Sequence, residues 1–172
     1  MKYLLENEQS ERLLFRKLEE TDFTTWLQFF KDPSSTRHWQ SGITDPGTNC
    51  RLWFDKIYYR YANDLGGMNV LIEKANGAFV GQCGLLIQTV DGMEELEIGY
   101  SIMPAFRNKG YAAEAAAKCK EYAFAHNFRD SLISIISIDN IESQKVAVKN
   151  KMQLEKTTFY SDNIVHIYRV WK

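Results

Sequence analysis

The stretch SIMPAFRNKGYAAEAAAKCKEYAF, residues 101–124, changes character in its middle. An apolar run ends at Pro104, two cations surround Gly110, and an alanine-rich segment continues to about His126. The alanine-rich segment has the spacing of a helix with small residues on one side, so it can lie close to a sheet. The sequence therefore predicts a strand that leads through a glycine into the N-terminus of a helix.

This turn has the properties of an anion site. The first turn of a helix leaves N–H groups unpaired, and the helix dipole adds partial positive charge there, which favours phosphate. Arg107 and Lys109 add formal charge, while Gly110 permits an unusual φ and a close approach of the anion. Neither GxxxxGK[ST] nor GxGxxG occurs at this turn. The alternative is that Gly110 only turns the chain and that both cations are solvated.

The bulk composition indicates one globular unit. A chain of 172 residues, 45% hydrophobic and 13% aromatic, can bury one core, and neither a linker nor a repeat interrupts it. We therefore expect a single domain over residues 1–172. Its 21 Lys and Arg against 22 Asp and Glu give a net charge of -1. This balance provides no field for capturing nucleic acid or an anionic membrane, so any anion binding must be local.

The cysteines and the N-terminus bear on localisation. Cys50, Cys83 and Cys119 form no CxxC pair, so we expect reduced thiols and neither a disulfide framework nor a metal site. The N-terminus lacks the apolar region of a signal peptide, and no segment approaches the roughly 18 apolar residues of a membrane span. We expect a cytoplasmic protein, monomeric or homodimeric, that binds neither nucleic acid nor membrane.

Upstream of the opening stretch, the pattern predicts a strand, two helices and a meander. RLLFRKL, from Arg12, alternates as a strand, and a helix follows with Thr21 as its N-cap. A short helical piece at residues 36–39 precedes a second helix capped by Thr48. Residues 67–103 contain the turn dipeptides Asn76-Gly77 and Asp91-Gly92, both typical of type I′ hairpins, and read as three antiparallel strands. The aromatic residues Trp26, Phe29 and Phe30 are expected in the core.

Downstream, SLISIISI is a buried strand, NIESQKVAVKNKM a helix, and LEKTTFY and IVHIYRVWK a closing pair of strands. The full order is one strand, two helices, a three-strand meander, a helix, a strand, a helix and two strands. Such an order implies a mixed sheet in an α+β, or α/β layered, domain.

Two motifs resemble a known family. Arg107-Asn108-Lys109-Gly110-Tyr111-Ala112 resembles the R/Q-x-x-G-x-G/A coenzyme A motif of the GNAT N-acetyltransferase superfamily. LEIGYSIMPAFRNKGYAAEAA resembles the fourth strand and third helix of the RimJ/RimL-type branch, which acetylates ribosomal protein N-termini among other amines. DNIESQKVAVKNKM resembles the N-x-x-S helix of that branch. The resemblance implies a mixed, mostly antiparallel sheet of about seven strands flanked by about four helices.

The resemblance also implies how acetyl-CoA would bind. In the family, the fourth strand is splayed from the fifth by a bulge, and the pantetheine arm pairs with the exposed strand edge. The residues implied for pantetheine are Tyr100, Ser101 and Ile102. Those implied for the diphosphate, besides Arg107, are Asn108, Lys109, Gly110, Tyr111, Ala112 and Ala113. Gly99 is a candidate for the bulge, with simple packing as the alternative.

The implied reaction is direct attack of a primary amine on the thioester, a protein N-terminal α-amine being one candidate acceptor. By the resemblance, Asn140 contacts pantetheine or orients the amine, and Ser143 donates a hydrogen bond to the leaving sulfur. The residues alone leave another reading open, in which Asn140 is an N-cap and Ser143 is its N3 partner. Many relatives have a Tyr further along this helix, where this chain has Ala147.

The general base is open among several residues. Glu97 is the candidate, with an outward strand Glu or a buried hydrogen-bond acceptor as the alternative. Glu114 is expected to orient backbone, and His166 either lines the amine side or is structural. An α-amine has a pKa of about 8 and a lysine amine about 10.4, so a site without a clear base favours α-amines.

The acceptor pocket carries no readable motif, although the aromatic residues Trp39, Trp53, Tyr58 and Tyr59 are candidate walls. Lys151 stands where the family commonly has a helix-ending Gly, so either Asn150 takes the left-handed conformation or Lys151 does so with strain. Two alternatives to an enzyme remain. One is a catalytically silent acyl-CoA sensor of the same fold, and the other is an interaction protein whose glycine turn is empty.

Overall fold

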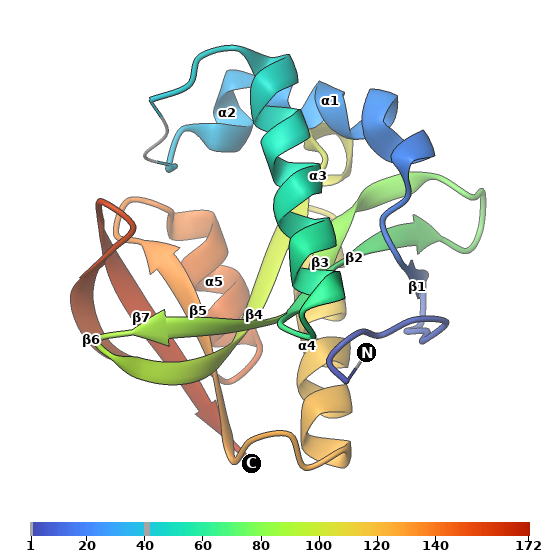
Figure 1. The fold of residues 1–172 in the computed structure, drawn as a ribbon. Coiled ribbons are helices and arrows are strands. Elements are labelled where there is room, and N and C mark those ends of the chain that lie inside the picture. Colours follow the sequence, from blue (N-terminus) through green and yellow to red (C-terminus); the bar gives the residue numbers. More distant parts are fainter. Residues whose placement is uncertain (1, 40–41) are drawn as a thin grey trace.

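The computed structural model describes residues 2–39 and 42–172 and contains one seven-stranded sheet (Figure 1). The strand order is β1-β2-β3-β4-β5-β7-β6, and all neighbouring strands are antiparallel except β4 and β5. The strands are β1 Leu13–Arg16, β2 Gly66–Glu73, β3 Phe79–Val90, β4 Met93–Ile102, β5 Ser131–Ser137, β6 Gln153–Tyr160 and β7 Asn163–Trp171. The predicted mixed, mostly antiparallel sheet is therefore confirmed.

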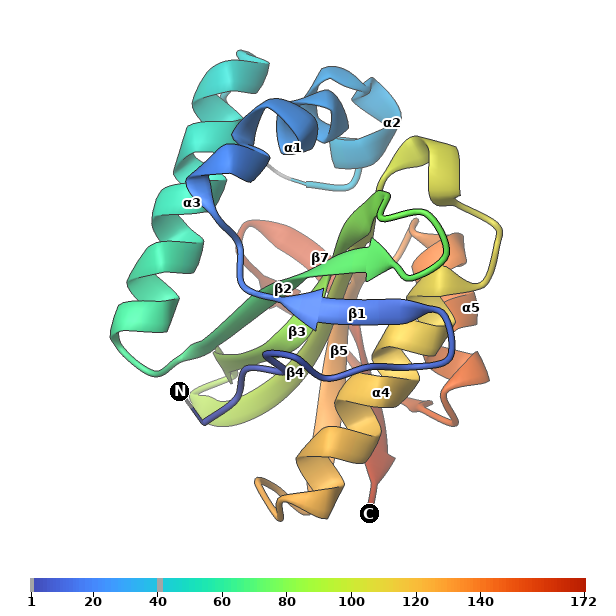
Figure 2. The ribbon, with the colours of Figure 1, turned by 90° about the vertical axis from the view of Figure 1, so that its right-hand side faces the viewer.

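Helices cover both faces of this sheet. They are α1 Phe23–Lys31, α2 Pro33–Thr36, α3 Pro46–Ala62, α4 Tyr111–Ala125 and α5 Ile141–Lys149, with 3-10 turns at Glu20–Asp22 and Pro104–Phe106. Figure 2 shows α4 and α5 on one face of the sheet and α3 on the other, with α1 and α2 beside the upper half of α3. The described residues thus form five helices where about four were expected, because α2 is a separate single turn. Within this part of the chain, none of the helices is long and apolar enough to cross a membrane.

Each face of the sheet has its own core. The face toward α4 buries the small residues Ala115, Ala116, Cys119 and Ala123 against the strands, as the helical spacing predicted. The face toward α1 and α3 buries Trp26, Phe29 and Phe30, which confirms the expectation that these aromatic residues belong to the core. The middle strands of the sheet are therefore packed against helices on both faces.

The starts of three helical segments differ from the prediction. Helix α1 begins after Asp22 rather than Thr21, which lies in the preceding 3-10 turn. Helix α3 is capped by Asp45, whose Oδ2 accepts from the Thr48 N–H at 2.7 Å, so Thr48 is the capped residue and not the cap. The short helical piece lies at residues 33–36 instead of 36–39, because Asp32 caps it and Pro follows at its first position. The carboxylates of Asp32 and Asp45 cap their helices, whereas Asp22 takes the N-cap position of α1 without a side-chain cap bond.

The two turns of the meander have different geometries. Asp91 and Gly92 both have positive φ, +49° and +78°, as the predicted type I′ turn requires. Between β2 and β3 only Gly77 has positive φ, and its N–H donates to Glu73 O at 2.9 Å across a longer loop. The type I′ prediction for Asn76-Gly77 is therefore wrong, although the hairpin itself is present.

Candidate active site

The sheet opens between β4 and β5. The two strands pair only at Glu97 and Ile133, and beyond this point the Ser134 hydroxyl donates to Ile98 O at 2.9 Å in place of a backbone ladder. The edge of β4 that faces β5 is consequently free of strand pairing toward its C-terminal end. The β3–β4 register runs through Gly99 without a shift, and a Cβ on Gly99 would meet Leu86 Cδ1 at 2.9 Å. The opening thus comes from strand divergence, and Gly99 serves packing.

The strand leads, as predicted, into the N-terminus of α4. Gly110 has φ of +84° at the N-cap position, and Asn108 before it has φ of +60°. None of the described side chains caps the helix, and its first intrahelical bond runs from Glu114 N–H to Gly110 O at 3.0 Å. The N–H groups of residues 111–113 therefore have no intrahelical acceptor, which is the arrangement that binds anions.

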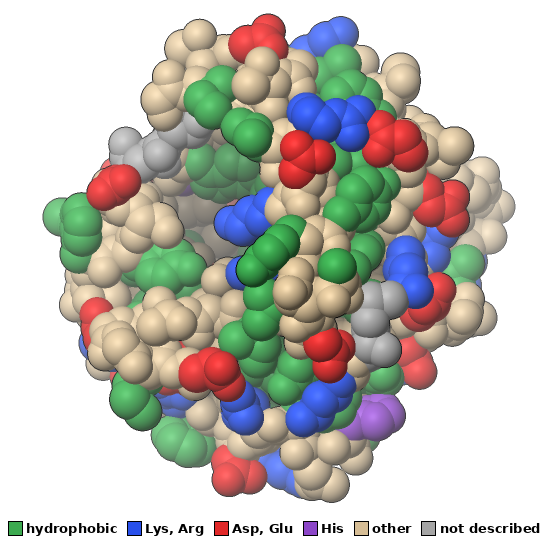
Figure 3. Space-filling model, viewed as in Figure 1, with side chains coloured by type: hydrophobic (Ala, Val, Ile, Leu, Met, Phe, Trp, Pro, Cys, Tyr) green, Lys and Arg blue, Asp and Glu red, His purple; other side chains and the backbone are tan. Residues whose placement is uncertain are grey.

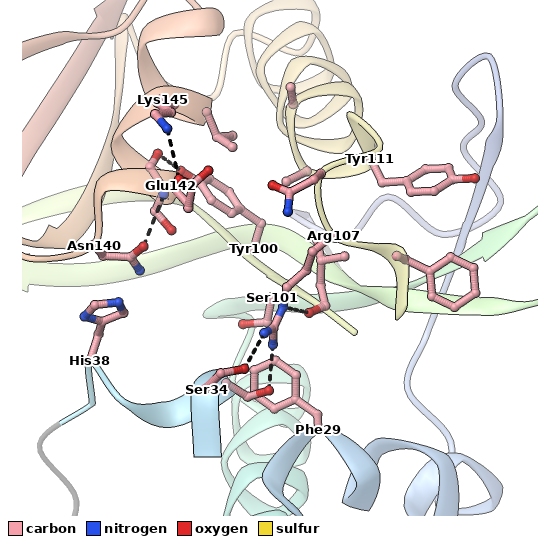
Figure 4. A pocket seen from close by; sticks show the side chains of 18 of the residues that line it. Phe29, Ser34, His38, Tyr100, Ser101, Arg107, Tyr111, Asn140, Glu142 and Lys145 are labelled. Carbon is pink, nitrogen blue, oxygen red and sulfur yellow. Dashed lines mark hydrogen bonds and ion pairs between the residues drawn. The ribbon is translucent and has the colours of Figure 1, made fainter. Parts of the chain in front are cut away.

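A cavity of 490 Å³ extends from this helix end to α5 (Figure 4). Nearly every residue predicted to bind the coenzyme lines it: Tyr100, Ser101, Ile102, Arg107, Asn108, Gly110, Tyr111, Ala112, Ala113 and Asn140. Ser143 lines it as well, whereas Lys109 and Glu97 do not. Tyr100 and Asn140, which are 40 positions apart in the sequence, thus line one cavity where β4 and β5 diverge.

The two cations that flank Gly110 have different environments. Arg107 donates to Ile102 O at 3.1 Å and to the hydroxyls of Ser34 and Ser35 at 2.8 and 2.6 Å, as Figure 4 shows in part. Burial lowers the pKa of Arg107. Lys109 is exposed, and its Nζ lies 5.4 Å from the centre of the Phe106 ring. Arg107 therefore ties α2 to the end of β4, and Lys109 lies at the surface beside the cavity.

A third cation at this turn was not predicted. Arg12 Nη1 donates to Lys109 O at 3.0 Å, its guanidinium lies 4.2 Å from the centre of the Tyr111 ring, and Nε pairs with Glu114 at 2.7 Å. Glu114 also accepts from Arg12 N–H and from the Ser10 hydroxyl. Burial raises the pKa of Glu114, but these hydrogen bonds outweigh it and lower the pKa overall. Glu114 orients backbone, as expected, and Arg12 fastens the turn to β1.

The start of α5 lies opposite this turn. Asn140 Oδ1 accepts from Ser143 N–H at 3.2 Å, so the N-cap reading of these residues is correct. The Tyr100 hydroxyl donates to Ser143 O at 2.7 Å and fixes the helix against β4. These contacts use the Asn140 oxygen and the Ser143 backbone. The Asn140 amide nitrogen and the Ser143 hydroxyl have no protein partner among the described residues, and both residues line the cavity.

A second cavity, of 430 Å³, meets the first from the α3 side of the sheet. The residues that line both are His38, Trp39, Tyr100, Ser101, Asn140 and Ser143. Successive strand side chains point to opposite faces, so Glu97 and Ser101 face this second cavity. Figure 3 shows the corresponding hollow beside α3. A molecule in each cavity would thus meet the other at the opening in the sheet.

Glu97 is held by a hydrogen-bond network. Gln88 Nε2 donates to Glu97 at 2.6 Å, and Gln88 Oε1 accepts from Arg60 at 2.8 Å and from the Tyr160 hydroxyl at 3.1 Å. Burial raises the pKa of Glu97, although the hydrogen bonds from Gln88 and from the Ile135 N–H partly oppose this. A carboxylate with a raised pKa is a better proton acceptor than an ordinary surface Glu.

The histidine and aromatic candidates differ in whether they line the two cavities. His38, which the sequence did not single out, lines both cavities, and burial together with the Arg37 charge lowers its pKa. His166 lines neither cavity, and its Nδ1 is 2.8 Å from the Thr157 hydroxyl. Among the aromatic candidates, Trp39 and Trp53 stack 5.4 Å apart at the second cavity, whereas Tyr58 and Tyr59 do not line it. Within residues 2–39 and 42–172, no three His, Cys, Asp or Glu side chains converge to hold a metal ion.

Comparison with known proteins agrees with this geometry. The family described as Acetyltransferase (GNAT) domain matches residues 12–153. The protein YkkB of Bacillus subtilis (strain 168) is 31% identical over 152 residues, which cover 86% of each chain. An acetyltransferase from Agrobacterium tumefaciens superposes with a TM-score of 0.79 at 24% identity, covering 100% of this chain and 95% of that one.

A spermidine N-acetyltransferase from Vibrio cholerae, solved with CoA and spermine, superposes with a TM-score of 0.72 at 14% identity, covering 93% of this chain and 95% of that one. At this identity the likeness concerns the fold. The family match, in contrast, spans most of the sequence and includes the strand, turn and helix that form the first cavity. The chain belongs to the GNAT acetyltransferase family.

Proposed function

We propose that this protein transfers an acetyl group from acetyl-CoA to a primary amine by direct attack on the thioester. The observation that carries the proposal is the meeting of two cavities at the opening between β4 and β5, with an uncapped helix N-terminus at the far end of one of them. The diphosphate and the reactive thioester of one elongated ligand fit the two ends of the first cavity. The amine then approaches through the second.

The residues of the first cavity fit coenzyme A. The N–H groups at the start of α4 and the positive φ of Asn108 and Gly110 suit the diphosphate. The open edge of β4 at Tyr100–Ile102 can pair with the two amides of pantetheine as an added strand. Arg107 acts here mainly by holding the end of β4, since its guanidinium already binds Ile102 O and two serine hydroxyls.

The reaction needs a donor to the leaving sulfur, a group that orients the substrates and an acceptor for the amine proton, and side chains at the junction of the two cavities suit each of these. Since none of the described residues binds the Ser143 hydroxyl or the Asn140 amide nitrogen, the hydroxyl can donate to the departing sulfur and the amide can hold pantetheine or orient the amine. Glu97 faces the second cavity with a raised pKa and accepts the amine proton, directly or through water. A thiol of pKa about 8.5 leaves readily, so one hydroxyl donor suffices in place of the Tyr that Ala147 replaces.

An α-amine is the acceptor that this site suits best. It has a pKa of about 8, so about one-tenth of it is neutral at pH 7, whereas a lysine amine with a pKa of about 10.4 is almost fully protonated. A single carboxylate as proton acceptor is adequate for the first and poor for the second. A peptide N-terminus or a small α-amine is therefore our proposed acceptor class.

Thiol release from acetyl-CoA tests the proposal when it is measured with a panel of peptide N-termini and small amines. We expect amine-dependent release and an acetylated product detected by mass spectrometry. Tight coenzyme binding without turnover on any acceptor would instead identify an acyl-CoA sensor. If calorimetry shows no heat and no competition with coenzyme A, the first cavity is not a coenzyme site and the proposal is wrong.

A further inference from the structure

The second cavity has an unusual charge distribution at its α3 wall. Lys56 lies on α3 and lines the cavity, one helical turn before Arg60. Figure 3 shows the hollow bordered on its α3 side by Lys and Arg side chains. An incoming acceptor therefore passes positive charge before it reaches the junction of the two cavities.

Only one acidic group balances this charge within the cavity. Among the described residues that line it, Glu97 is the only Asp or Glu, and Lys56 is the only Lys or Arg. Arg60, one turn further along α3, is buried and does not line the cavity, and it donates to Leu65 O, Ile87 O and Gln88 Oε1. The other polar lining groups are serines, amides, tyrosines, tryptophans and His38.

Lys56 has no partner among the residues that the structure describes. Within the described part of the chain its ammonium makes neither an ion pair nor a hydrogen bond, unlike Lys145 and Lys118, which pair with Glu142 and Glu8. Although Lys56 stays open to solvent at the mouth, desolvation by the cavity wall and the charge of Arg60 lower its pKa, and Glu97 opposes them only in part. An anionic ligand stabilises such a partly desolvated cation, which none of the described residues pairs.

We propose that the amine accepted in the second cavity carries a carboxylate near its reactive nitrogen and that Lys56 binds this carboxylate. The proposal rests on the proposed function and narrows its acceptor class. The neutral amine lies toward Glu97 and Ser101, and the carboxylate lies at the mouth, against α3. A polyamine is disfavoured, because its second ammonium would face Lys56, and among the described lining residues the only carboxylate is Glu97, which the reacting amine occupies.

Two sources supply this chemistry, an amino acid with its own carboxylate and a peptide whose first residue is acidic. Matched acceptors separate them: alanine against alaninamide, and Asp-Ala-Ala-amide against Asn-Ala-Ala-amide, with spermidine as a polycation. The readout is kcat/KM from thiol release, corrected for the fraction of neutral amine, together with acceptor binding to the CoA-saturated protein by calorimetry. We expect the carboxylate-bearing member of at least one pair to be preferred about tenfold in wild type. The pair that shows the preference identifies the source.

Variants of Lys56 then test the assignment. Lys56→Met should reduce the preference to about twofold or less, and Lys56→Glu should reverse it and admit spermidine. Lys31→Met, which removes a surface cation at the end of α1, is the matched control and should keep the wild-type preference. Circular dichroism and thermal unfolding show whether each variant is folded.

The outcomes distinguish this inference from the proposed function. Turnover with equal use of both members of each pair, or a preference that survives Lys56→Met, overturns the inference and leaves acetyl transfer standing. Lys56-dependent binding of the carboxylate without thiol release supports the anion site and overturns acetyl transfer. No acceptor binding and no turnover overturns both.

Discussion

Substitution of Gly110 probes the diphosphate site at its centre. This residue has φ of +84° and lines the first cavity beside the free N–H groups of α4. A Cβ there would meet nothing closer than Arg12 Nη2 at 3.4 Å, so a small side chain fits sterically. Asn and Asp are nearly isosteric, and both tolerate the left-handed region better than other residues. Comparing Gly110→Asp with Gly110→Asn therefore isolates the effect of one negative charge.

The charge effect can be estimated from the geometry. Two unit charges about 5 Å apart repel by about 3 kcal/mol at an effective dielectric constant of about 20, and by about 0.8 kcal/mol in water. Gly110 is exposed, so a value of about 2 kcal/mol between these limits is appropriate. Arg12 lies close enough to attract the new carboxylate and to reduce the repulsion. We expect Gly110→Asp to bind coenzyme A about 10- to 30-fold more weakly than Gly110→Asn.

Calorimetric titration with coenzyme A at two salt concentrations measures this difference. Because the turn is exposed, the difference in coenzyme A affinity between the two variants should become smaller at high salt. Pantetheine, which carries no phosphate, should bind both variants alike. Coenzyme A affinities within twofold of each other at low salt would refute the placement of the diphosphate at this helix end.

Three further substitutions test other parts of the account. Ser143→Ala should lower kcat by about tenfold or more while coenzyme affinity, measured by calorimetry, stays within about twofold, because only the free hydroxyl is removed. Glu97→Gln should lower kcat by about 100-fold or more. In wild type the raised pKa of Glu97 should put the acid-side loss of kcat, measured at saturating acceptor, at a higher pH than an ordinary Glu gives, and this limb should vanish in the variant. Lys151→Gly should raise the free energy of unfolding in urea by about 0.5–1 kcal/mol, since Lys151 has φ of +66°, whereas Lys151→Ala should give no such gain.

Local signals in the sequence were sufficient for most of the fold. Asp91-Gly92 set a type I′ turn, and the alanine spacing of residues 110–126 set the buried face of α4, because both depend on neighbours a few positions away. Cap choice failed where two candidates stood close together. Asp45 displaced Thr48 because its carboxylate reaches the backbone, and Asp22 took the N-cap position from Thr21 without a side-chain cap bond; the sequence does not show which side chain reaches the backbone.

The candidate site was predictable only where it follows the motifs. Residues 100–113 are contiguous in a strand, a turn and a helix. The second motif, at the start of α5, lines the same cavity from the other side of the opening between β4 and β5. The contacts of Arg12 with the turn and with Glu114 could not be found in the sequence, because Arg12 and Glu114 are 102 positions apart and meet only when β1 joins the sheet. The same holds for His38 and Lys56, whose positions at the second cavity depend on how α2 and α3 pack over the sheet.

The most direct test of the central claim is a crystal structure with coenzyme A bound. We predict that the pantetheine arm lies along the β4 edge at Tyr100–Ile102, that the diphosphate lies on the N–H groups of residues 108–113, and that the thiol points to the Ser143 hydroxyl where the two cavities meet. Coenzyme bound away from the opening between β4 and β5, or with its thiol remote from this junction, would contradict the account.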